Sequence, residues 1–80
     1  MPKTMPLSSL QVLDKARIIA FTSGCDPQFR RHLMNMGVLP NAEVTLVRIA
    51  PLRDPIEIKV RDYRLVIRLV DARFIQVERL

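Results

Sequence analysis

Glycine, cysteine and tryptophan are scarce in this sequence, and each scarcity excludes a class of site. The only glycines are Gly24 and Gly37, so no glycine-rich loop can wrap a phosphate, and nucleotide binding is not expected. The single cysteine, Cys25, excludes an intramolecular disulfide and fits a reducing compartment. Tryptophan is absent, and the aromatic residues are one tyrosine and three phenylalanines, so the core must be built from aliphatic side chains.

Long apolar runs are also missing. No segment approaches the roughly 20 apolar residues that a transmembrane helix needs. Residues 1–6 contain no apolar stretch of the kind found in signal peptides. We therefore expect a cytoplasmic protein, with residues 1–6 as a flexible tail and residues 7–80 as one domain. A chain of 80 residues supports one modest core and leaves no room for a deep active-site cleft.

The clearest local signal is a short helix after residue 25. Asp26 can cap free backbone N–H groups, and Pro27 suits the first helical position because its φ is preset. Three apolar residues follow at spacings of four and three, which places them on one face: Phe29, Leu33 and Met36. Gly37 suits the left-handed residue that ends a helix. We predict a helix of about ten residues, too short to be stable alone, that packs on the domain through this face.

The rest of the domain follows a period of two, which is typical of strands. The predicted strands are residues 16–21, 44–49, 56–60, 63–70 and 74–78. Residues 50–55 form a loop because they contain two prolines, and residues 7–10 form a short helical turn. Short strands with brief connections close into a small barrel, which protects the sheet edges. The predicted fold is mainly β: a five-stranded antiparallel barrel with one inserted α-helix and a short helical turn near the N-terminus.

Several short motifs follow one another across residues 7–78. They are Leu7-x-x-Leu10, Ala16-x-Ile18, Arg31-x-Leu33-x-x-x-Gly37-x-x-Pro40, Ala50-Pro51-Leu52-x-Asp54-Pro55-Ile56, Ile67-Arg68 and Ala72-x-x-Ile75-x-Val77. This ordered set resembles the FeoA family of ferrous iron transport proteins. The resemblance implies an SH3-like barrel. It also implies a cytoplasmic accessory that acts by protein–protein interaction on FeoB, the large membrane GTPase that transports ferrous iron, and that reaches the inner membrane through this partner.

The chain departs from the family at four positions that usually carry glycine: Leu13, Asn41, Arg53 and Asp62. Asparagine and aspartate tolerate a positive φ well. Leucine and arginine do not, so Leu13 and Arg53 predict loops that differ in shape from those of the family.

Metal and catalytic sites are not expected. Cys25 and His32 are the only soft metal ligands apart from methionine sulfur, and a stable transition-metal site usually takes three or four ligands. A free thiol and a histidine on the helix surface are the commoner explanations. No Ser–His–Asp or Cys–His arrangement is supported, so the sequence predicts neither an enzyme nor a cofactor.

Five residues are candidates for contact with FeoB: Arg30, Arg31, Met34, Leu39 and Leu52. The first three lie on or beside the outer face of the predicted helix, and methionine adapts to irregular partners. Leu39 follows the helix, and Leu52 lies at the tip of the proline-bracketed loop, where apolar residues suggest recognition. We expect all of them near the helix side of the domain. The alternatives are that Met34 only covers the margin of the core and that Leu39 and Leu52 plug the ends of the barrel.

The net charge of +5 permits an anionic partner. For a FeoA-like protein it would steer the chain toward an acidic or membrane-proximal site on FeoB, without insertion into the membrane. A nucleic-acid-binding barrel is the alternative, but stacking of bases needs exposed aromatic residues beside basic ones. Only Tyr63, between Arg61 and Arg64, has that setting, so no nucleic-acid partner is expected. A detached regulatory domain related to iron-dependent repressors, whose C-terminal domain has a similar barrel, is a further alternative.

Overall fold

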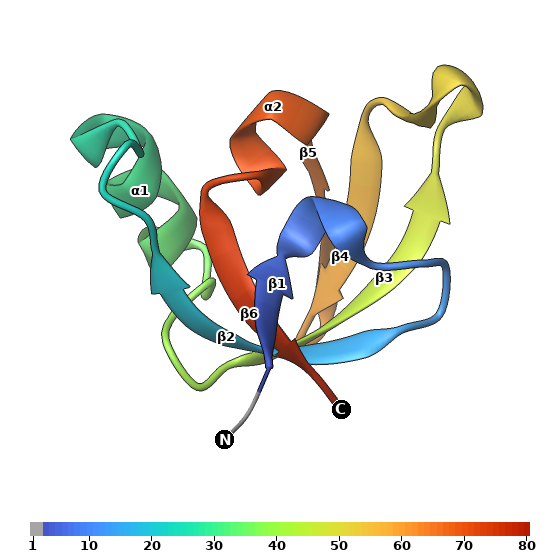
Figure 1. Cartoon of the computed structure of the whole chain (residues 1–80), viewed down its shortest axis with the longest axis horizontal. Helices are drawn as coiled ribbons and strands as arrows, with labels where there is room; N and C mark the ends of the chain where they lie inside the picture. Colours follow the sequence, from blue (N-terminus) through green and yellow to red (C-terminus); the bar gives the residue numbers. More distant parts are fainter. Residues whose placement is uncertain (1–2) are drawn as a thin grey trace.

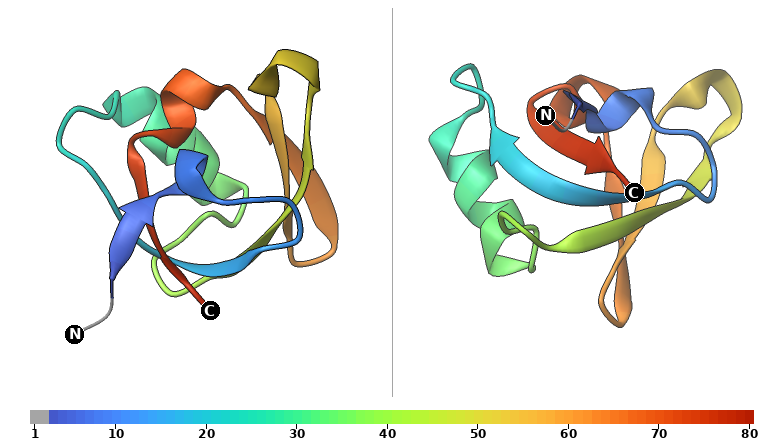
Figure 2. Two further views of the ribbon diagram at one scale, coloured as in Figure 1. Left: turned by 45° about the vertical axis from the view of Figure 1, so that its right-hand side comes forward. Right: turned by 60° about the horizontal axis from the view of Figure 1, so that its bottom comes forward.

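The computed structural model describes residues 3–80 and contains one antiparallel sheet that curls around the core (Figure 1 and Figure 2). Its six strands run in the order β1-β6-β2-β3-β4-β5. Their bounds are β1 Thr4–Pro6, β2 Lys15–Phe21, β3 Glu43–Ile49, β4 Ile56–Val60, β5 Tyr63–Ile67 and β6 Ile75–Arg79. The pairing register shifts within β2, at its pairing with β6, and within β3, at its pairing with β4. Such bulges bend a strand and increase its twist, which helps these two longest strands to cross the core.

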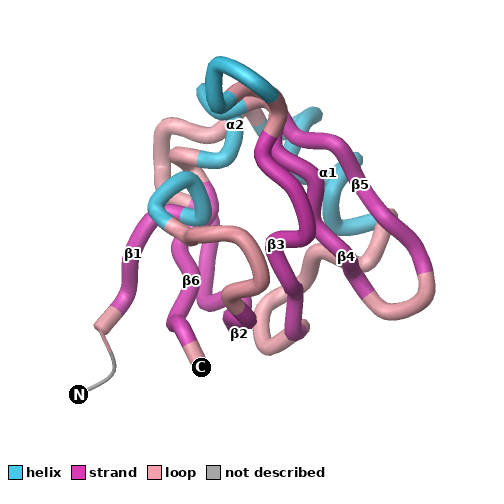
Figure 3. Tube along the Cα trace, turned by 90° about the vertical axis from the view of Figure 1, so that its right-hand side faces the viewer, coloured by secondary structure: helices cyan, strands magenta, loops and turns pink. Residues whose placement is uncertain are grey.

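Four short helical segments connect the strands: η1 Leu7–Ser9, α1 Pro27–Asn35, η2 Pro51–Arg53 and α2 Leu69–Ala72. Figure 1 places α1 at one side of the sheet and η2, at the tip of the β3–β4 connection, at the other side, with α2 between them. Figure 3 views the molecule from the η2 side, and α1 lies behind the strands there. The helix and the 50–55 loop therefore stand on opposite sides of the molecule.

The mainly β architecture predicted from the sequence is confirmed, but the sheet has six strands instead of five. The missed strand is β1, where Thr4 pairs with Glu78 and Pro6 with Gln76. The prediction of a flexible tail was therefore wrong for Thr4–Pro6, while residues 1 and 2 lie outside the described residues. Three residues are too few to display a period of two, so only the pairing with β6 defines this strand.

The predicted strand 63–70 is also shorter than expected. β5 ends at Ile67, and Leu69–Ala72 form α2. The Leu69 N–H donates a hydrogen bond of 2.9 Å to the Asp54 carboxylate, and the Arg68 carbonyl accepts bonds from the first turn of α2. The bond to Asp54 joins residues 15 apart in the chain. The alternation of apolar residues carries no sign of such a contact.

The core is aliphatic, as the composition predicts. The largest fully buried side chains belong to Leu7, Ile18, Leu46, Ile58, Ile75, Val38, Val44, Val60 and Val77. Phe21 and Phe29 are only partly buried and pack against this core from outside. Burying an aliphatic side chain contributes about 1.5–3 kcal/mol, so these residues are the main source of stability.

Three of the four positions without the expected glycine have a positive φ: 75° at Leu13, 74° at Asn41 and 68° at Arg53. In the β4–β5 turn it is Arg61, at 56°, that takes this conformation, not Asp62. Leu13 and Arg53 thus adopt the left-handed backbone that glycine favours. These two loops contain a backbone turn that glycine favours without having glycine, and a difference in loop shape from the family stays a prediction.

Candidate protein-binding surface

Helix α1 is held to the barrel by one apolar face. Its first turn is capped by Asp26, whose carboxylate accepts a hydrogen bond from the Gln28 N–H at 3.3 Å. Leu33 is buried, and Phe29 and Met36 are partly buried against the core, as the helical spacing predicts. A helix of nine residues is not stable alone. The position of α1 therefore depends on these three packing contacts.

The C-terminal end of α1 has the hydrogen bonds of a Schellman motif. Gly37 has a φ of 97°, and its N–H donates to the Met34 carbonyl at 3.1 Å. The Val38 N–H donates to the Leu33 carbonyl at 3.0 Å, and both of these side chains are buried. The helix end and the residues that follow it, including Leu39, are thus fixed to the core.

The outer face of α1 is basic. Arg30, Arg31 and His32 are exposed, while Met34 and the following Leu39 are partly buried. Within residues 3–80 the three ion pairs involve other arginines, so neither Arg30 nor Arg31 is paired with a carboxylate. Four of the predicted contact residues thus lie on or next to one rigid helix. We call Arg30, Arg31, Met34 and Leu39 the α1 surface.

Leu52 projects into solvent from the tip of the 50–55 loop. Its side chain is 97% exposed, and its backbone φ is 68°. Two backbone hydrogen bonds close the loop, from the Ala50 N–H to the Pro55 carbonyl at 3.0 Å and from the Arg53 N–H to the Ala50 carbonyl at 2.8 Å. Leu52 therefore does not plug an end of the barrel. The loop closed by these two hydrogen bonds instead exposes the Leu52 side chain to solvent.

The structure does not bring Leu52 together with the α1 surface. The 50–55 loop and α1 occupy opposite sides of the sheet (Figure 1). The prediction that all five residues lie near the helix side was wrong for Leu52. The strand order decides this separation, because β3 carries the chain from the end of α1 across the core to the loop, and local sequence patterns do not reveal strand order.

Cys25 and His32 do not form part of a metal cluster in the described residues. Cys25 is buried, and burial raises the pKa of its thiol. Its Sγ lies 3.7 Å from the Asp26 carbonyl oxygen, whereas His32 is exposed on α1. Between residues 3 and 80, no group of three His, Cys, Asp or Glu residues is arranged to hold a metal ion. None of the helices in this range is long and apolar enough to cross a membrane.

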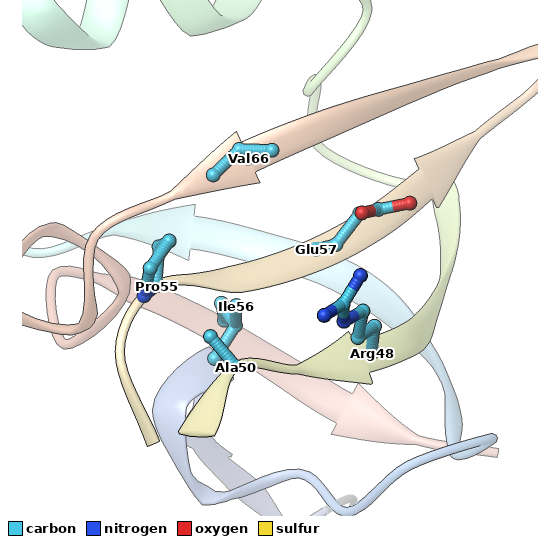
Figure 4. A pocket seen from close by; sticks show the side chains of 6 residues that line it. All are labelled: Arg48, Ala50, Pro55, Ile56, Glu57 and Val66. Carbon is cyan, nitrogen blue, oxygen red and sulfur yellow. The ribbon is translucent and has the colours of Figure 1, made fainter. Parts of the chain in front are cut away.

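The sequence analysis missed an apolar patch on the outer face of β3, β4 and β5. A hollow of about 200 Å³ lies there, and Figure 4 shows its lining: Arg48, Ala50, Pro55, Ile56, Glu57 and Val66. Val66 is 66% exposed, and Glu57 forms an ion pair of 3.4 Å with Arg64 on the same face. The sequence feature that could have indicated this patch was an apolar residue, Val66, at an outward-facing position of a strand. Among the exposed large apolar residues between positions 3 and 80, Tyr63 is the only aromatic one.

Known proteins match this chain in both sequence and fold. The FeoA domain matches residues 5–79. The chain belongs to the FeoA family. Over 74 residues, this FeoA chain is 36% identical to the Fe(2+) transport protein A/Fe(2+) transporter FeoB fusion protein of Porphyromonas gingivalis. That match covers 92% of the chain but only 8% of the fusion protein.

Solved FeoA structures have the same architecture. The FeoA protein from Chlorobium tepidum superimposes with a TM-score of 0.88 at 36% identity, covering 95% of this chain and 70% of that one. The Stenotrophomonas maltophilia FeoA, solved with zinc and described as an SH3 domain protein, superimposes with a TM-score of 0.80 at 24% identity. This second match covers 92% of this chain and 89% of that one, and it shows the fold alone. The predicted SH3-like architecture is confirmed.

Proposed function

We propose that this FeoA-family chain is an accessory protein of ferrous iron uptake that binds the cytoplasmic part of a FeoB-type transporter. The observation that carries the proposal is the Porphyromonas gingivalis relative, which joins FeoA and FeoB in one polypeptide. A covalent link raises the effective concentration of one module at the other, which is useful when the two modules contact each other. The transporter part of that protein lies outside the match, so the partner must be tested by binding.

In this proposal the α1 surface supplies the main contact. Arginine and methionine are enriched at the centres of interfaces, where a few residues dominate the binding energy. Arg30 and Arg31 have no carboxylate partner in the described residues and are available to acidic groups of the transporter. The helix that carries them is fixed at both ends, so little backbone conformational entropy is lost on binding. Binding would bring the chain to the cytoplasmic side of the membrane through its partner.

Leu52 is a second, separate contact in the same proposal. A leucine that is 97% exposed can bury nearly its whole side chain, which contributes about 1.5–3 kcal/mol. The 50–55 loop lies across the sheet from α1. The two contacts therefore need either one partner surface that extends around the molecule or two separate parts of the same partner. Contacts more than about 10 Å apart affect binding almost independently, so each can be tested alone.

The test uses Met34→Asp and Leu52→Asp with the purified cytoplasmic domain of FeoB. We expect each variant to bind about tenfold more weakly, because a carboxylate replaces an apolar contact and about 1.4 kcal/mol corresponds to a factor of ten. Calorimetric titration measures the affinity, and circular dichroism confirms that each variant is folded.

Each variant has a matched control. Leu13→Asp also places aspartate at an exposed leucine with a positive φ, and Asn35→Asp changes an exposed residue next to Met34 on α1. Both controls should bind like the wild type. Failure of the wild type to bind FeoB would refute the partner. Binding of both test variants at full strength would refute the contact surface, and an unfolded Met34→Asp would assign that residue to the core.

A further inference from the structure

One edge of the sheet is open along its whole length. β5 is the last strand in the sheet and pairs only with β4. Among residues 3–80, no backbone hydrogen bond other than those of the β4 ladder involves residues 63–67. Half of the backbone N–H and C=O groups of β5 therefore point outward without a partner among the described residues. Such an edge is a template for the addition of another strand.

A groove of about 360 Å³ lies beside this edge and is lined by residues of β5 and α1. Its floor is apolar because Phe29 of α1 and Met36, which follows α1, line it together with Leu65 and Ile67 of β5. All four side chains are buried or partly buried. The groove thus offers apolar contacts on the inner side of the open strand edge.

The ionisable groups around the groove are mostly basic. Arg64, Arg68 and His32 line it, against one carboxylate, Asp71. Along β5 and the residue that follows it the side chains alternate, with Leu65 and Ile67 buried and Arg64, Val66 and Arg68 exposed. The outer side of the edge therefore carries two arginines, of which Arg64 pairs with Glu57 at 3.4 Å, and the inner side is apolar.

We propose that the β5 edge binds an extended segment of another protein, in which acidic and apolar residues alternate, as an added strand. In a strand, successive side chains point to opposite faces of the sheet. One set of the segment's side chains would enter the groove below α1, and the other set would lie beside Arg64 and Arg68. Main-chain hydrogen bonds supply affinity in this mode, and the alternating side chains supply specificity.

The same observations disfavour two other occupants. A second copy of the chain would place the arginines of one β5 against those of the other, and like charges opposite each other destabilise a strand pair. Single-stranded nucleic acid needs exposed aromatic platforms, and Tyr63, at 40% exposure, is the only exposed aromatic in the described residues. The inference does not depend on FeoB as the partner, so either proposal can fail without the other.

The test uses the whole chain and a synthetic peptide of about seven residues, a usual strand length, in which glutamate and valine alternate. Chemical-shift changes in ¹⁵N-labelled protein should centre on β5, and the β5 amides should exchange more slowly with solvent. A peptide with lysine in place of glutamate should not bind. Two further peptides carry N-methyl groups on alternate residues, so that each peptide loses the backbone N–H donors along one edge of its strand. Only the peptide that loses the donors facing β5 should fail to bind.

The matched protein variants are Arg68→Glu and Lys3→Glu, which change the net charge equally at exposed positions. Arg68→Glu should weaken binding of the glutamate–valine peptide about fivefold, because an exposed ion pair becomes a repulsion, whereas Lys3→Glu should change it less than about twofold. The proposal is overturned if the peptide does not bind, if its shifts map to the 50–55 loop, or if both N-methylated peptides bind equally well. It is also overturned if oligothymidylate displaces the peptide, or if self-association without peptide is enough to slow the exchange of the β5 amides with solvent.

Discussion

At the scale of single residues, backbone conformation is the least expected feature of this FeoA chain. Leu13 has a φ of 75° although its side chain is 72% exposed and gains little from packing. A non-glycine residue in this conformation is less stable by about 1–2 kcal/mol than in the usual helical region. The turn persists because the Leu13 N–H donates to the Leu46 carbonyl, and the Leu46 N–H in turn donates to the Asp14 carbonyl at 2.9 Å. Tertiary hydrogen bonds thus hold a local conformation that the sequence disfavours.

Leu13→Gly tests this account. Glycine removes the strain but raises the entropy of the unfolded chain, so the free energy of unfolding should stay unchanged or rise by up to about 1 kcal/mol. The neighbouring Val12, which does not have a positive φ, is the control, and Val12→Gly should lower that free energy by about 0.5–1 kcal/mol. Urea denaturation measures both. Equal destabilisation by the two glycines would show that Leu13 carries no strain.

At the scale of elements, the inward face of the β4–β5 hairpin carries much of the stability. Ile58 is fully buried and Ile67 is 3% exposed, as the alternation predicts. Ile58→Ala and Ile67→Ala should each lower the free energy of unfolding by about 2–5 kcal/mol, a large part of the total for a small domain. Val66→Ala on the outer face of β5 should change it by less than about 0.5 kcal/mol. A loss of similar size at all three positions would contradict the assigned faces.

The same elements show what the sequence can and cannot predict. α1 was predictable because its start, its apolar face and its end depend on residues close together in the chain, from Asp26 to Gly37. β4 was predictable because its alternation is regular. β1 and α2 were not, because β1 exists through its pairing with β6, and the start of α2 is fixed by a hydrogen bond from Leu69 to Asp54. The exposure of Leu52 and its distance from α1 depend on the strand order, which no local pattern contains.

At the scale of the whole molecule, the chain carries a net charge of +5. The three ion pairs among residues 3–80 lie at the surface, each with an arginine side chain at least 40% exposed, and have N–O distances of 3.4–3.8 Å, so they add little to stability. Among residues 3–80, the positive charges without a paired carboxylate include Arg30 and Arg31, which are adjacent on α1. Such a patch acts chiefly on the rate of encounter with an acidic partner, because electrostatic steering operates before the contact forms.

The double change Arg30→Glu and Arg31→Glu should therefore slow association with the cytoplasmic domain of FeoB. Each substitution removes two units of positive charge, so the variant carries a net charge of +1 instead of +5. We expect the association rate at low salt to fall about tenfold and its dependence on salt to flatten, with a smaller change in the dissociation rate. Stopped-flow or surface-binding kinetics at several salt concentrations would measure these rates. The control, Lys3→Glu with Lys59→Glu, carries the same net charge but leaves α1 intact, so it should keep most of the association rate. If both double variants associate equally slowly, the charge of the whole molecule steers the encounter and the α1 surface has no special part in it.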